Sequence, residues 1–600
     1  MTKDIIYDPI DQYKTIKLEH SENSKNYFNE LVKKSKIDVF ENEKTVTKIK
    51  EDKFRLNDTA NLIKRLKFWR LVTIILFVIA IFIPIFYYYA ERDESNSVLL
   101  VTILLCLIPL IMLVILILVI KKNNFKINNL TSLVNKLEKQ IDDNTNLAWE
   151  QVYDLNLLFD WKDNKKLIEK TLPQFKIFNQ PSAQFENIFK NSGLSNRPKS
   201  ETTYQIIGGT FMENPFMISI VLKNTISLKE YVGTKYITWK EGSSTKSEEL
   251  VAAISKPFPE YHYFGEANLW SDFADKLSFQ REPSNSAKIS DKELKSRIKK
   301  LDKISEKAIK KNSNINLLNN KEFEVYFNCL NRSDETQYRL LFTPIAQRQL
   351  TKLIKSTTDN ISHDYFYWDK NQKIHTLTND FLTEIELGFN PALNYDYDFK
   401  KIQEKFLKRQ YETFRGIYLG MTPLMSVPGL QESPREKIIY NDSLEQQYAD
   451  RFHEVIANHF SEDAIKHPNS VTKNIIKSQY LINEGNIEKI SISVHGYNGI
   501  PQIAIIPVRG GDGYWHDVEV PWIEYIPVTK KHILVVVKLT TKNTKIAMHN
   551  SRFKNLFQKN KINEDNVFVY DNLINFLTND GELTLNQKQL VEDIQILISK

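Results

Sequence analysis

The sequence predicts an α+β protein: a two-span transmembrane helical hairpin with a juxtamembrane helix pair, followed by a large mixed α/β cytoplasmic region. Three observations support this fold class. Two long runs near the N-terminus are apolar and uncharged. Apolar residues at helical spacing flank these runs. From about residue 150, short β-branched and aromatic runs alternate with helical stretches. The composition, 42% hydrophobic and 26% charged over 600 residues, argues against a wholly disordered chain.

The two apolar runs, residues 71–90 and 98–120, predict the transmembrane spans. As a helix each run is about 30 Å long, which is enough to cross the hydrocarbon layer. Basic residues lie outside the runs, whereas residues 91–97 hold one arginine against three acids. Basic flanks stay in the cytoplasm. We therefore expect a multi-pass cell-membrane protein with both termini and the bulk of the chain cytoplasmic, and with the lipid bilayer as a partner. Because neither run contains an ionisable residue, an anchor is favoured over a channel.

Apolar residues on both sides of the spans predict a helix pair. Downstream, they recur at spacings of three and four, and upstream a weaker pattern is interrupted by Lys53. One interpretation is an antiparallel pair within the chain. The other is self-association of two copies through Leu130, Val134 and Leu137. The downstream positions are Ile127, Leu130, Val134, Leu137 and Ile141, and the upstream positions are Val46, Ile49, Leu56 and Ile63.

Changes in composition divide the remaining chain into parts. The predicted order is a polar N-terminal segment at 1–45, the helices and hairpin at 46–147, a first α+β part at 150–280, a lysine-rich connector at 281–320, a continuation of the first α+β part at 321–396, a helical connector at 397–470 and a second α+β part at 471–600.

Several local patterns predict single elements. The runs "EFEVYFNCL" and "QYRLLF" are typical of paired strands, and Pro344 is placed to begin a helix. The stretch "HDYFYWDKNQKIHTL", residues 363–377, predicts an aromatic hairpin whose side chains either pack in the core or bind a partner. The glycine pair in "IIGGTFMENPF" indicates a turn or bulge.

A lysine-rich helix is predicted over residues 288–311, where ten basic side chains stand against four acidic ones. One interpretation is a solvated connector helix. The other is contact with the anionic inner leaflet of the membrane through Lys295, Arg297, Lys299 and Lys300. The formal net charge of +7 is mild for this length, so no nucleic-acid partner is expected.

A glycine-rich stretch, the late histidines and the cysteines are the candidates for chemistry in this sequence. The stretch "RGGDGYWHD" at 509–517 is flanked by strand-like runs, so it predicts a hairpin turn rather than a phosphate loop, which opens onto a helix. His453 and His459 are six residues apart and so cannot share a helix face as metal ligands. His495, His516 and His532 form a site only if the fold brings them together. The two cysteines, Cys106 and Cys329, indicate neither a disulfide framework nor a metal site. No catalytic residue, cofactor or metal is predicted.

Five stretches together carry a resemblance, and they run from "LVAAISKPFPEYHYFGEANLW" to "GGDGYWHDVEVPWIEYIPV". The others are "ADKLSFQREPS", "DETQYRLLFTPIAQRQLTKLI" and "FRGIYLGMTPLMSVP". The chain resembles, over about residues 60–540, an uncharacterised family of two-helix membrane proteins of mollicutes and other low-GC Gram-positive bacteria. The resemblance implies a hairpin followed by a large cytoplasmic region and implies no activity.

These observations predict a membrane-anchored interaction or scaffold protein with an unidentified protein partner and no catalytic motif. One alternative is a membrane-bound enzyme whose site is assembled from dispersed C-terminal residues. Another is a sensor of the inner membrane surface.

Overall fold

The computed structural model describes residues 6, 8–90, 107–160, 162–177, 198–281, 289–310, 317–329, 331–356, 365–370, 374–379, 387, 394–432, 450–484, 486–539, 556–570 and 573–599. The chain forms two compact units. The larger comprises Met1–Leu31, Leu157–Asn394 and Lys405–Lys600, and the smaller comprises Val32–Asn156 and Tyr395–Glu404. Both β-rich parts of the sequence, together with the first 31 residues, therefore belong to the larger unit.

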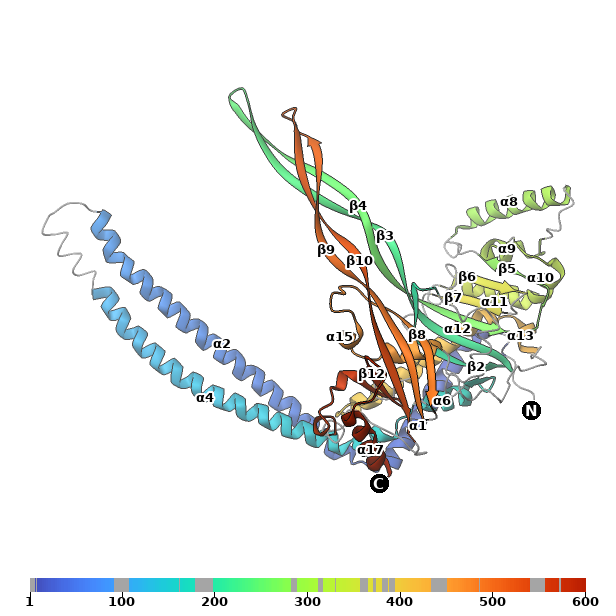
Figure 1. Ribbon diagram of the computed structural model, residues 1–600, viewed down its shortest axis with the longest axis horizontal. Helices are drawn as coiled ribbons and strands as arrows, with labels where there is room; N and C mark the ends of the chain where they lie inside the picture. The colour runs from blue at the N-terminus through green and yellow to red at the C-terminus, as the bar shows by residue number, and fades with distance from the viewer. Residues whose placement is uncertain are drawn as a thin grey trace. The chain divides into compact units, whose positions relative to one another are not determined.

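The smaller unit is built on two long helices, α2 (Val39–Ala90) and α4 (Leu107–Gln151), which lie side by side (Figure 1). Val46 and Ile49 of α2 pack with Ile141 and Ala148 of α4. Over residues 124–141, the five predicted downstream positions are the ones that are partly or fully buried. The predicted pairing of two helices within the chain is therefore confirmed. Lys53, which interrupts the upstream pattern, is exposed.

Asn42 ties this helix pair to a third segment of the smaller unit. Its side-chain amide donates to the carbonyl oxygens of Ala148 and Tyr397 at 3.3 and 2.9 Å, and its Oδ1 accepts from the backbone N–H of Phe399 at 3.1 Å. Asn42 is fully buried. Its three hydrogen bonds satisfy polar groups that would be costly to bury alone.

The predicted two-span transmembrane hairpin is wrong. No helix within the described ranges is both long enough and apolar enough to cross a membrane. The apolar run at 71–90 belongs to α2, which begins well before it at Val39, and the run at 98–120 is described only from Leu107, where α4 begins. The predicted outer loop at 91–97 and residues 98–106 lie outside the described residues. An apolar run counted in the sequence was therefore insufficient evidence for a span.

Two antiparallel sheets form the centre of the larger unit. The first has the order β1-β2-β3-β4-β7-β6-β5, and the second has the order β11-β12-β10-β9-β8. The first sheet comprises β1 (Phe175–Ile177), β2 (Glu201–Phe211), β3 (Asn214–Glu241), β4 (Ser244–Trp270), β5 (Phe279–Arg281), β6 (Tyr365–Asp369) and β7 (Ile374–Asn379). The second comprises β8 (Ile475–Glu484), β9 (Ile487–Arg509), β10 (Trp515–Lys538), β11 (Val567–Tyr570) and β12 (Leu573–Thr578).

Several helices complete the larger unit. The described ones are α1 (Pro9–Ser35), α5 (Tyr153–Leu158), α6 (Lys162–Thr171), α8 (Asp291–Lys310), α9 (Lys321–Phe327), α10 (Glu335–Leu341), α11 (Pro344–Lys355), α12 (Phe399–Met425), α13 (Pro428–Glu432), α14 (Asp450–Ala457), α15 (Glu462–Ile465), η4 (Glu564–Asn566) and α17 (Leu585–Ser599), of which α1, α5 and α12 each extend into the smaller unit.

The predicted strand pair at "EFEVYFNCL" and "QYRLLF" is wrong, because these runs form α9 and α10. Asn320 and Asp334 cap the two helices: their side chains accept from the backbone N–H groups of Phe323 and Gln337. The aromatic residues of α9 and α10 are buried at helical spacing. Capping and burial outweigh the strand propensity of these residues. The helix beginning at Pro344 and the lysine-rich helix are confirmed as α11 and α8.

The glycine pair of "IIGGTFMENPF" does not form a turn. Gly208 and Gly209 lie within β2, in register with Met217 and Phe216 of β3, and the turn follows at Met212 and Glu213. A Cβ atom at Gly209 would overlap the carbonyl oxygen of Lys176 on β1. Glycine is needed here for close approach of two backbones.

The aromatic hairpin is confirmed as β6 and β7, whose Asp369 pairs with Ile374. Phe366 and Trp368 are fully buried against Phe279, with ring centroids 5.8 and 5.9 Å away. Tyr365 and Tyr367 alternate with them and are exposed. The core interpretation therefore holds for one face of β6, as the period-two geometry of a strand requires.

Candidate functional site

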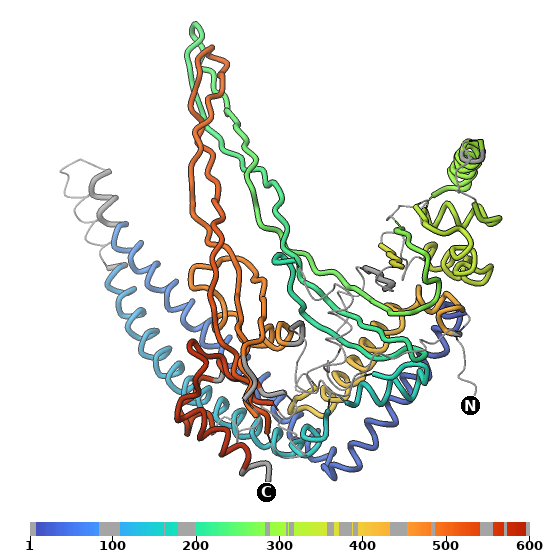
Figure 2. The backbone as a smooth tube through the Cα atoms, turned by 45° about the vertical axis from the view of Figure 1, so that its right-hand side comes forward, coloured from blue at the N-terminus to red at the C-terminus, as the bar shows by residue number. Residues whose placement is uncertain are grey.

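Two long hairpins extend beyond the sheets of the larger unit and lie side by side (Figures 1 and 2). In the first hairpin, β2 pairs with β3 only as far as Lys223, and β7 pairs with β4 only from Gly265. In the second, β8 pairs with β9 only as far as His495, and β12 pairs with β10 only from Ile533. Residues 224–264 and 496–532 therefore form two-stranded ribbons. We call these two ribbons together the two-hairpin arm.

The second ribbon ends at the glycine-rich turn. Arg509 pairs with Trp515, and the N–H of Gly513 donates to the carbonyl oxygen of Gly510 at 2.9 Å. Gly513 has a φ of 84°, which favours glycine. The Asp512 carboxylate accepts from the backbone N–H of Tyr514 and contacts the His516 ring at 2.8 Å. The predicted hairpin turn is confirmed.

A small apolar core joins the two ribbons near their tips. Ile237, Leu250 and Ala252 of the first hairpin pack against Val518 and Val520 of the second. Gly233 allows the backbones to approach, because a Cβ atom there would overlap the carbonyl oxygen of Glu519. One face of each ribbon therefore packs in this core, which we call the inner face, and the opposite face of each ribbon is the outer face.

Polar contacts reinforce the junction between the ribbons. The N–H of Gly511 donates to the Glu248 carboxylate at 2.6 Å, and the ammonium of Lys235 donates to the carbonyl oxygen of Asp517 at 3.0 Å. Nearer the sheets, the Lys256 ammonium lies 4.6 Å from the ring centroid of Trp522. Together with the apolar core, these contacts hold the two ribbons as a pair.

The outer face of the first ribbon exposes large apolar side chains. Leu228, Val232 and Tyr236 of β3 are 74, 53 and 72% exposed, and Val251 of β4 is 55% exposed. Val251 pairs with Thr234, so it lies on the same face as the three β3 residues. We call these four residues the outer stripe. Exposed apolar side chains that recur on one face of a ribbon, here at every fourth residue of β3, are typical of a binding surface.

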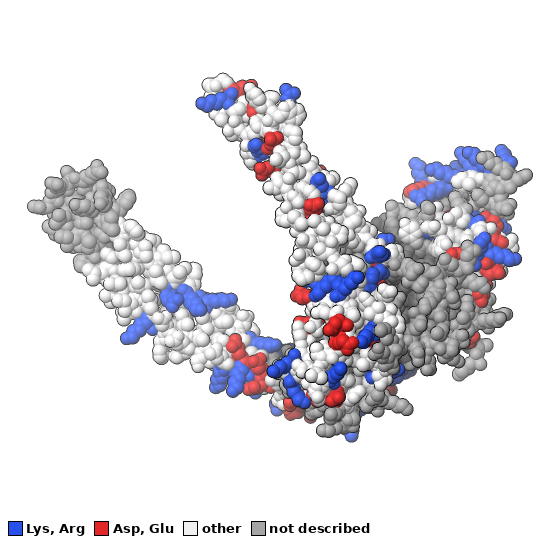
Figure 3. All heavy atoms as spheres, in the orientation of Figure 1, with Lys and Arg blue, Asp and Glu red and all other residues white. Residues whose placement is uncertain are grey.

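The second ribbon shows a matching pattern. Ile503 and Ile505 of β9 are 63 and 62% exposed, and they alternate with less exposed residues. On the face of the molecule in Figure 3, the arm carries few charged side chains, whereas Lys and Arg gather over α8. The arm is therefore predominantly uncharged on this face.

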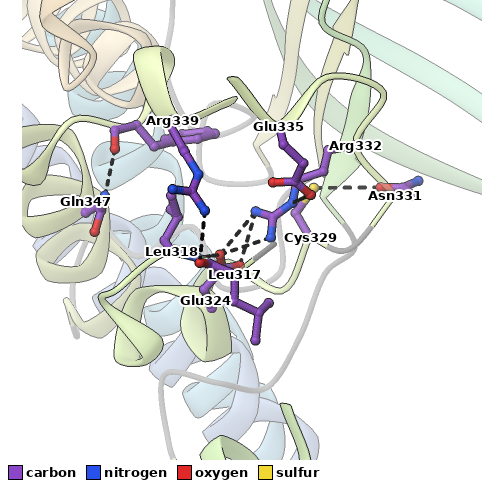
Figure 4. Close-up of polar contacts among 10 residues, drawn as sticks. Leu317, Leu318, Glu324, Cys329, Asn331, Arg332, Glu335, Arg339 and Gln347 are labelled. Atoms are coloured by element: carbon purple, nitrogen blue, oxygen red, sulfur yellow. Dashed lines mark hydrogen bonds and ion pairs between the residues drawn. The ribbon is translucent and has the colours of Figure 1, made fainter. Parts of the chain in front are cut away.

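A fully buried ion pair lies elsewhere, between α9 and α10 (Figure 4). Nη1 and Nη2 of Arg332 each donate to Oε1 of Glu324 at 3.1 Å, and Nε donates to Glu335 at 2.9 Å. The guanidinium carbon also lies 4.1 Å from the ring centroid of Tyr338. Glu324 accepts a further bond from the backbone N–H of Leu318 at 2.8 Å. These contacts fix the loop between α9 and α10.

This charged cluster lacks an activated nucleophile. Burial raises the pKa of the neighbouring Cys329 thiol to about 12, although the charge of Arg332 opposes the shift. Only the thiolate is nucleophilic, so Cys329 is inert near neutral pH. Burial likewise raises the pKa of the Tyr338 hydroxyl well above its usual value. The cluster is suited to a structural role.

The late histidines are dispersed. His495 contacts the hydroxyl of Thr529 at 2.9 Å, His532 contacts the carbonyl oxygen of Ile465 at 3.0 Å, and His516 contacts Asp512 near the arm's tip. Thr529 and His516 are thirteen positions apart on β10. At about 3.3 Å per residue, that separation is roughly 43 Å. These three histidines do not form one site.

His453 and His459 also have separate surroundings. His453 is fully buried in α14, and burial lowers its pKa to about 3. His459 lies beyond the end of α14, stacks on Phe568 at 4.9 Å and contacts the carbonyl oxygen of Val455 at 2.8 Å. In the portion of the chain that the structure describes, no cluster of three or more His, Cys, Asp or Glu residues is arranged to hold a metal ion.

The residues proposed for contact with a membrane surface lie on α8. Lys295, Lys299 and Lys300 are exposed, and Arg297 is partly buried and forms an ion pair with Glu293 at 2.7 Å. Their contact with anionic lipid stays a prediction. The outer stripe was not predicted from the sequence, although the spacing of four between Leu228, Val232 and Tyr236, an even number that keeps them on one face of a strand, was a detectable pattern.

Comparison of the chain with known proteins finds no matching family model, no matching curated protein and no matching solved structure. The resemblance to a two-helix membrane protein family stays a prediction.

Proposed function

We propose that this protein is an interaction or scaffold protein that binds a protein partner through the two-hairpin arm. The observation that carries the proposal is the outer stripe, which places four large exposed apolar side chains on the face of the first ribbon opposite the face that packs on the second ribbon. Burying such side chains against a partner is favourable by about 1.5–3 kcal/mol each. The proposal keeps the interaction role predicted from the sequence and omits the membrane anchor.

The construction of the arm supports this role. The apolar core and the close approach of Gly233 to Glu519 hold the two ribbons together. The outer stripe therefore lies on a pair of packed hairpins rather than on a single hairpin. A two-stranded hairpin alone is only marginally stable in water. Preorganisation of this kind lowers the entropic cost of binding.

A catalytic role finds less support. The Cys329 thiol is kept protonated by burial, and His516 lies thirteen or more positions along β10 from Thr529, which pairs with His495, and from His532. Neither arrangement pairs an accessible nucleophile with a base at hydrogen-bonding distance.

The proposal is tested by comparing two variants of the full chain in cells that make the protein. In the first, Leu228, Val232 and Tyr236 are changed to Ser. In the second, which is the control, Lys295, Lys299 and Lys300 on α8 are changed to Gln. Both variants change exposed side chains. Crosslinked partners are quantified by mass spectrometry against the wild-type chain.

We expect the outer-stripe variant to lose a specific crosslinked partner and the α8 variant to keep it, with unchanged thermal unfolding in both. Retention of every partner by the outer-stripe variant contradicts the proposal. If only the α8 variant loses the partner, the lysine-rich helix and not the outer stripe is the binding surface.

A further inference from the structure

We propose that the partner binds by adding a β-strand to the free edge of β3, and this inference rests on the proposed function of the arm. The occupant is an extended segment of another protein, with apolar residues on one face and acidic residues on the other. Strand addition uses backbone hydrogen bonds for affinity and alternate side chains for specificity.

The prolines of the arm reveal which backbone groups face outward. In an antiparallel pair, opposite residues alternate between exchanging two hydrogen bonds and exchanging none. Pro257 lies opposite Leu228, and Pro259 lies opposite Ile226. Because proline has no N–H, these two pairs are ones that exchange no hydrogen bond across the ribbon. The pairing from Phe216 to Glu241 has no register shift. The even-numbered residues from 226 to 240 therefore direct their N–H and C=O groups to the free edge of β3.

The same reasoning shows that the other three edges are interrupted. On β9 and β10, odd-numbered residues of one strand pair with odd-numbered residues of the other. All four prolines of this ribbon occupy odd-numbered positions: Pro501, Pro507, Pro521 and Pro527. They therefore also face outward, and each removes one edge donor. Outward prolines protect edge strands from pairing with other chains. On β4, Pro257 and Pro259 interrupt the ribbon, and its longest stretch free of proline is residues 244–256.

The edge of β3 alone is free of proline along its whole ribbon, residues 224–241. Its residues 226–240 make no backbone hydrogen bond to an element other than β4 in the ranges that the structure describes. A continuous row of outward N–H and C=O groups is a template for an added strand. Among the strands of the arm, β3 is therefore the one best suited to receive it.

Side chains beside this edge define the chemistry of the added strand. Leu228, Val232 and Tyr236 lie on one face, so an added strand would place its own apolar residues beside them. Lys229 and Lys235 lie on the other face and are exposed. Lys229 is directly opposite Lys256, and their ammonium groups lie over the rings of Phe258 and Trp522 at 5.1 and 4.6 Å. No ion pair neutralises either lysine among the described residues, so acidic residues on the added strand would complement this positive charge.

The test uses the full chain and a synthetic probe peptide of about nine residues, VEVTVEVTV, which has the alternation described above. Binding is measured by fluorescence anisotropy with the wild-type chain, with Thr234→Pro and with Ser255→Pro. Thr234 presents its N–H to the free edge of β3, and Ser255 does the same on β4. The two substitutions are thus matched, and natural prolines already occupy equivalent positions in the arm.

We expect the probe to bind the wild-type chain and Ser255→Pro equally, and to bind Thr234→Pro about tenfold more weakly, because the variant loses an edge hydrogen bond and distorts the edge. Two probes methylated on alternate backbone nitrogens extend the test without changing the protein. Methylation of the nitrogens whose N–H groups face β3 should abolish binding, whereas methylation of the nitrogens that face away from β3 should leave binding unchanged.

Absence of probe binding to the wild-type chain overturns the proposal, as do equal binding of both methylated probes and equal weakening by the two proline variants. If Thr234→Pro instead dissociates a dimer of the full chain with which the probe does not compete, a second copy occupies the edge and the proposal fails. If Leu228→Ser loses the cellular partner while methylation has no effect, the proposed function stands and strand addition fails.

Discussion

Arg332 and Glu324 form an ion pair in which both side chains are completely shielded from solvent. Two guanidinium nitrogens contact the same carboxylate oxygen at 3.1 Å, and Glu335 contacts the third nitrogen. The pair lies in the segment between α9 and α10. Removing Glu324 leaves the buried guanidinium with Glu335 as the one carboxylate that still contacts it among the described residues, and a buried charge that loses a partner is costly.

We therefore predict that Glu324→Leu lowers the free energy of unfolding by about 3–5 kcal/mol. The double variant Glu324→Leu/Arg332→Met should be less destabilised than Glu324→Leu alone, because no isolated charge remains buried. Urea unfolding of the wild-type chain, both single variants and the double variant measures the difference. Additive losses in the double variant would show that the two side chains are not coupled.

The contact between Gly233 and Glu519 predicts a position that tolerates no side chain. Gly233→Ala places a Cβ atom against the carbonyl oxygen of Glu519, which belongs to a backbone and cannot rotate away. We expect a loss of about 1–3 kcal/mol and faster cleavage of the arm by a protease. Thr234→Ala, at the exposed neighbouring position, is the control and should change neither measurement strongly. Equal protease resistance of Gly233→Ala and the wild-type chain would refute the close packing of the ribbons.

His453 predicts a loss of stability in acid. Burial lowers its pKa to about 3, whereas an unfolded chain has a histidine pKa near 6.5. Below about pH 6.5 the unfolded state takes up a proton that the folded state excludes. The stabilisation is therefore complete above that pH and is lost as the pH falls toward 3.

The variant His453→Leu should flatten the dependence of stability on pH between about pH 6 and pH 4, by up to about 1.4 kcal/mol per pH unit. His262→Leu, the same substitution at a histidine whose side chain is 54% exposed, is measured beside it for comparison. Urea unfolding at several pH values measures the slope. An identical slope in His453→Leu and the wild-type chain would show that His453 does not titrate as its burial requires.

In the smaller unit, a buried and an exposed leucine of α4 allow the same substitution to be compared at two positions of one helix. Leu137 of α4 is 5% exposed and Leu133 is 44% exposed. Leu137→Asp buries a charge in the packed interface and should cost about 3 kcal/mol or more, whereas Leu133→Asp should have little effect. Thermal unfolding measures both. If Leu137→Asp leaves the chain stable and instead dissociates a native oligomer, this face joins copies rather than α2 and α4.

Parts of the fold were predictable because local chemistry determines them. Glycines at 510, 511 and 513 between strand-like runs specify a hairpin turn, and apolar residues at 127–141 specify one face of a helix. The α9 and α10 segments were mistaken for strands, since their aromatic residues have high strand propensity. Their N-caps at Asn320 and Asp334 were the overlooked evidence.

The candidate site was less accessible to sequence reasoning. The exposed alternation of Leu228, Val232 and Tyr236 is visible in the sequence, but their exposure depends on where the neighbouring strands stop pairing. The approach of Gly233 to Glu519 joins segments far apart in the chain and has no local pattern. The transmembrane prediction is wrong because no helix among the described residues is both long enough and apolar enough to cross a membrane.

The central claim is that the outer face of β3 contacts a partner protein. The most direct measurement is a photocrosslinking scan, in which a photoreactive amino acid replaces each residue from 228 to 237 in turn in cells that make the protein. The account predicts crosslinks to one partner at Leu228, Val232 and Tyr236, and weak or no crosslinks at the alternate positions Tyr231 and Ile237, which face the second ribbon. Equal crosslinking at both sets of positions, or none at the outer stripe, would contradict it.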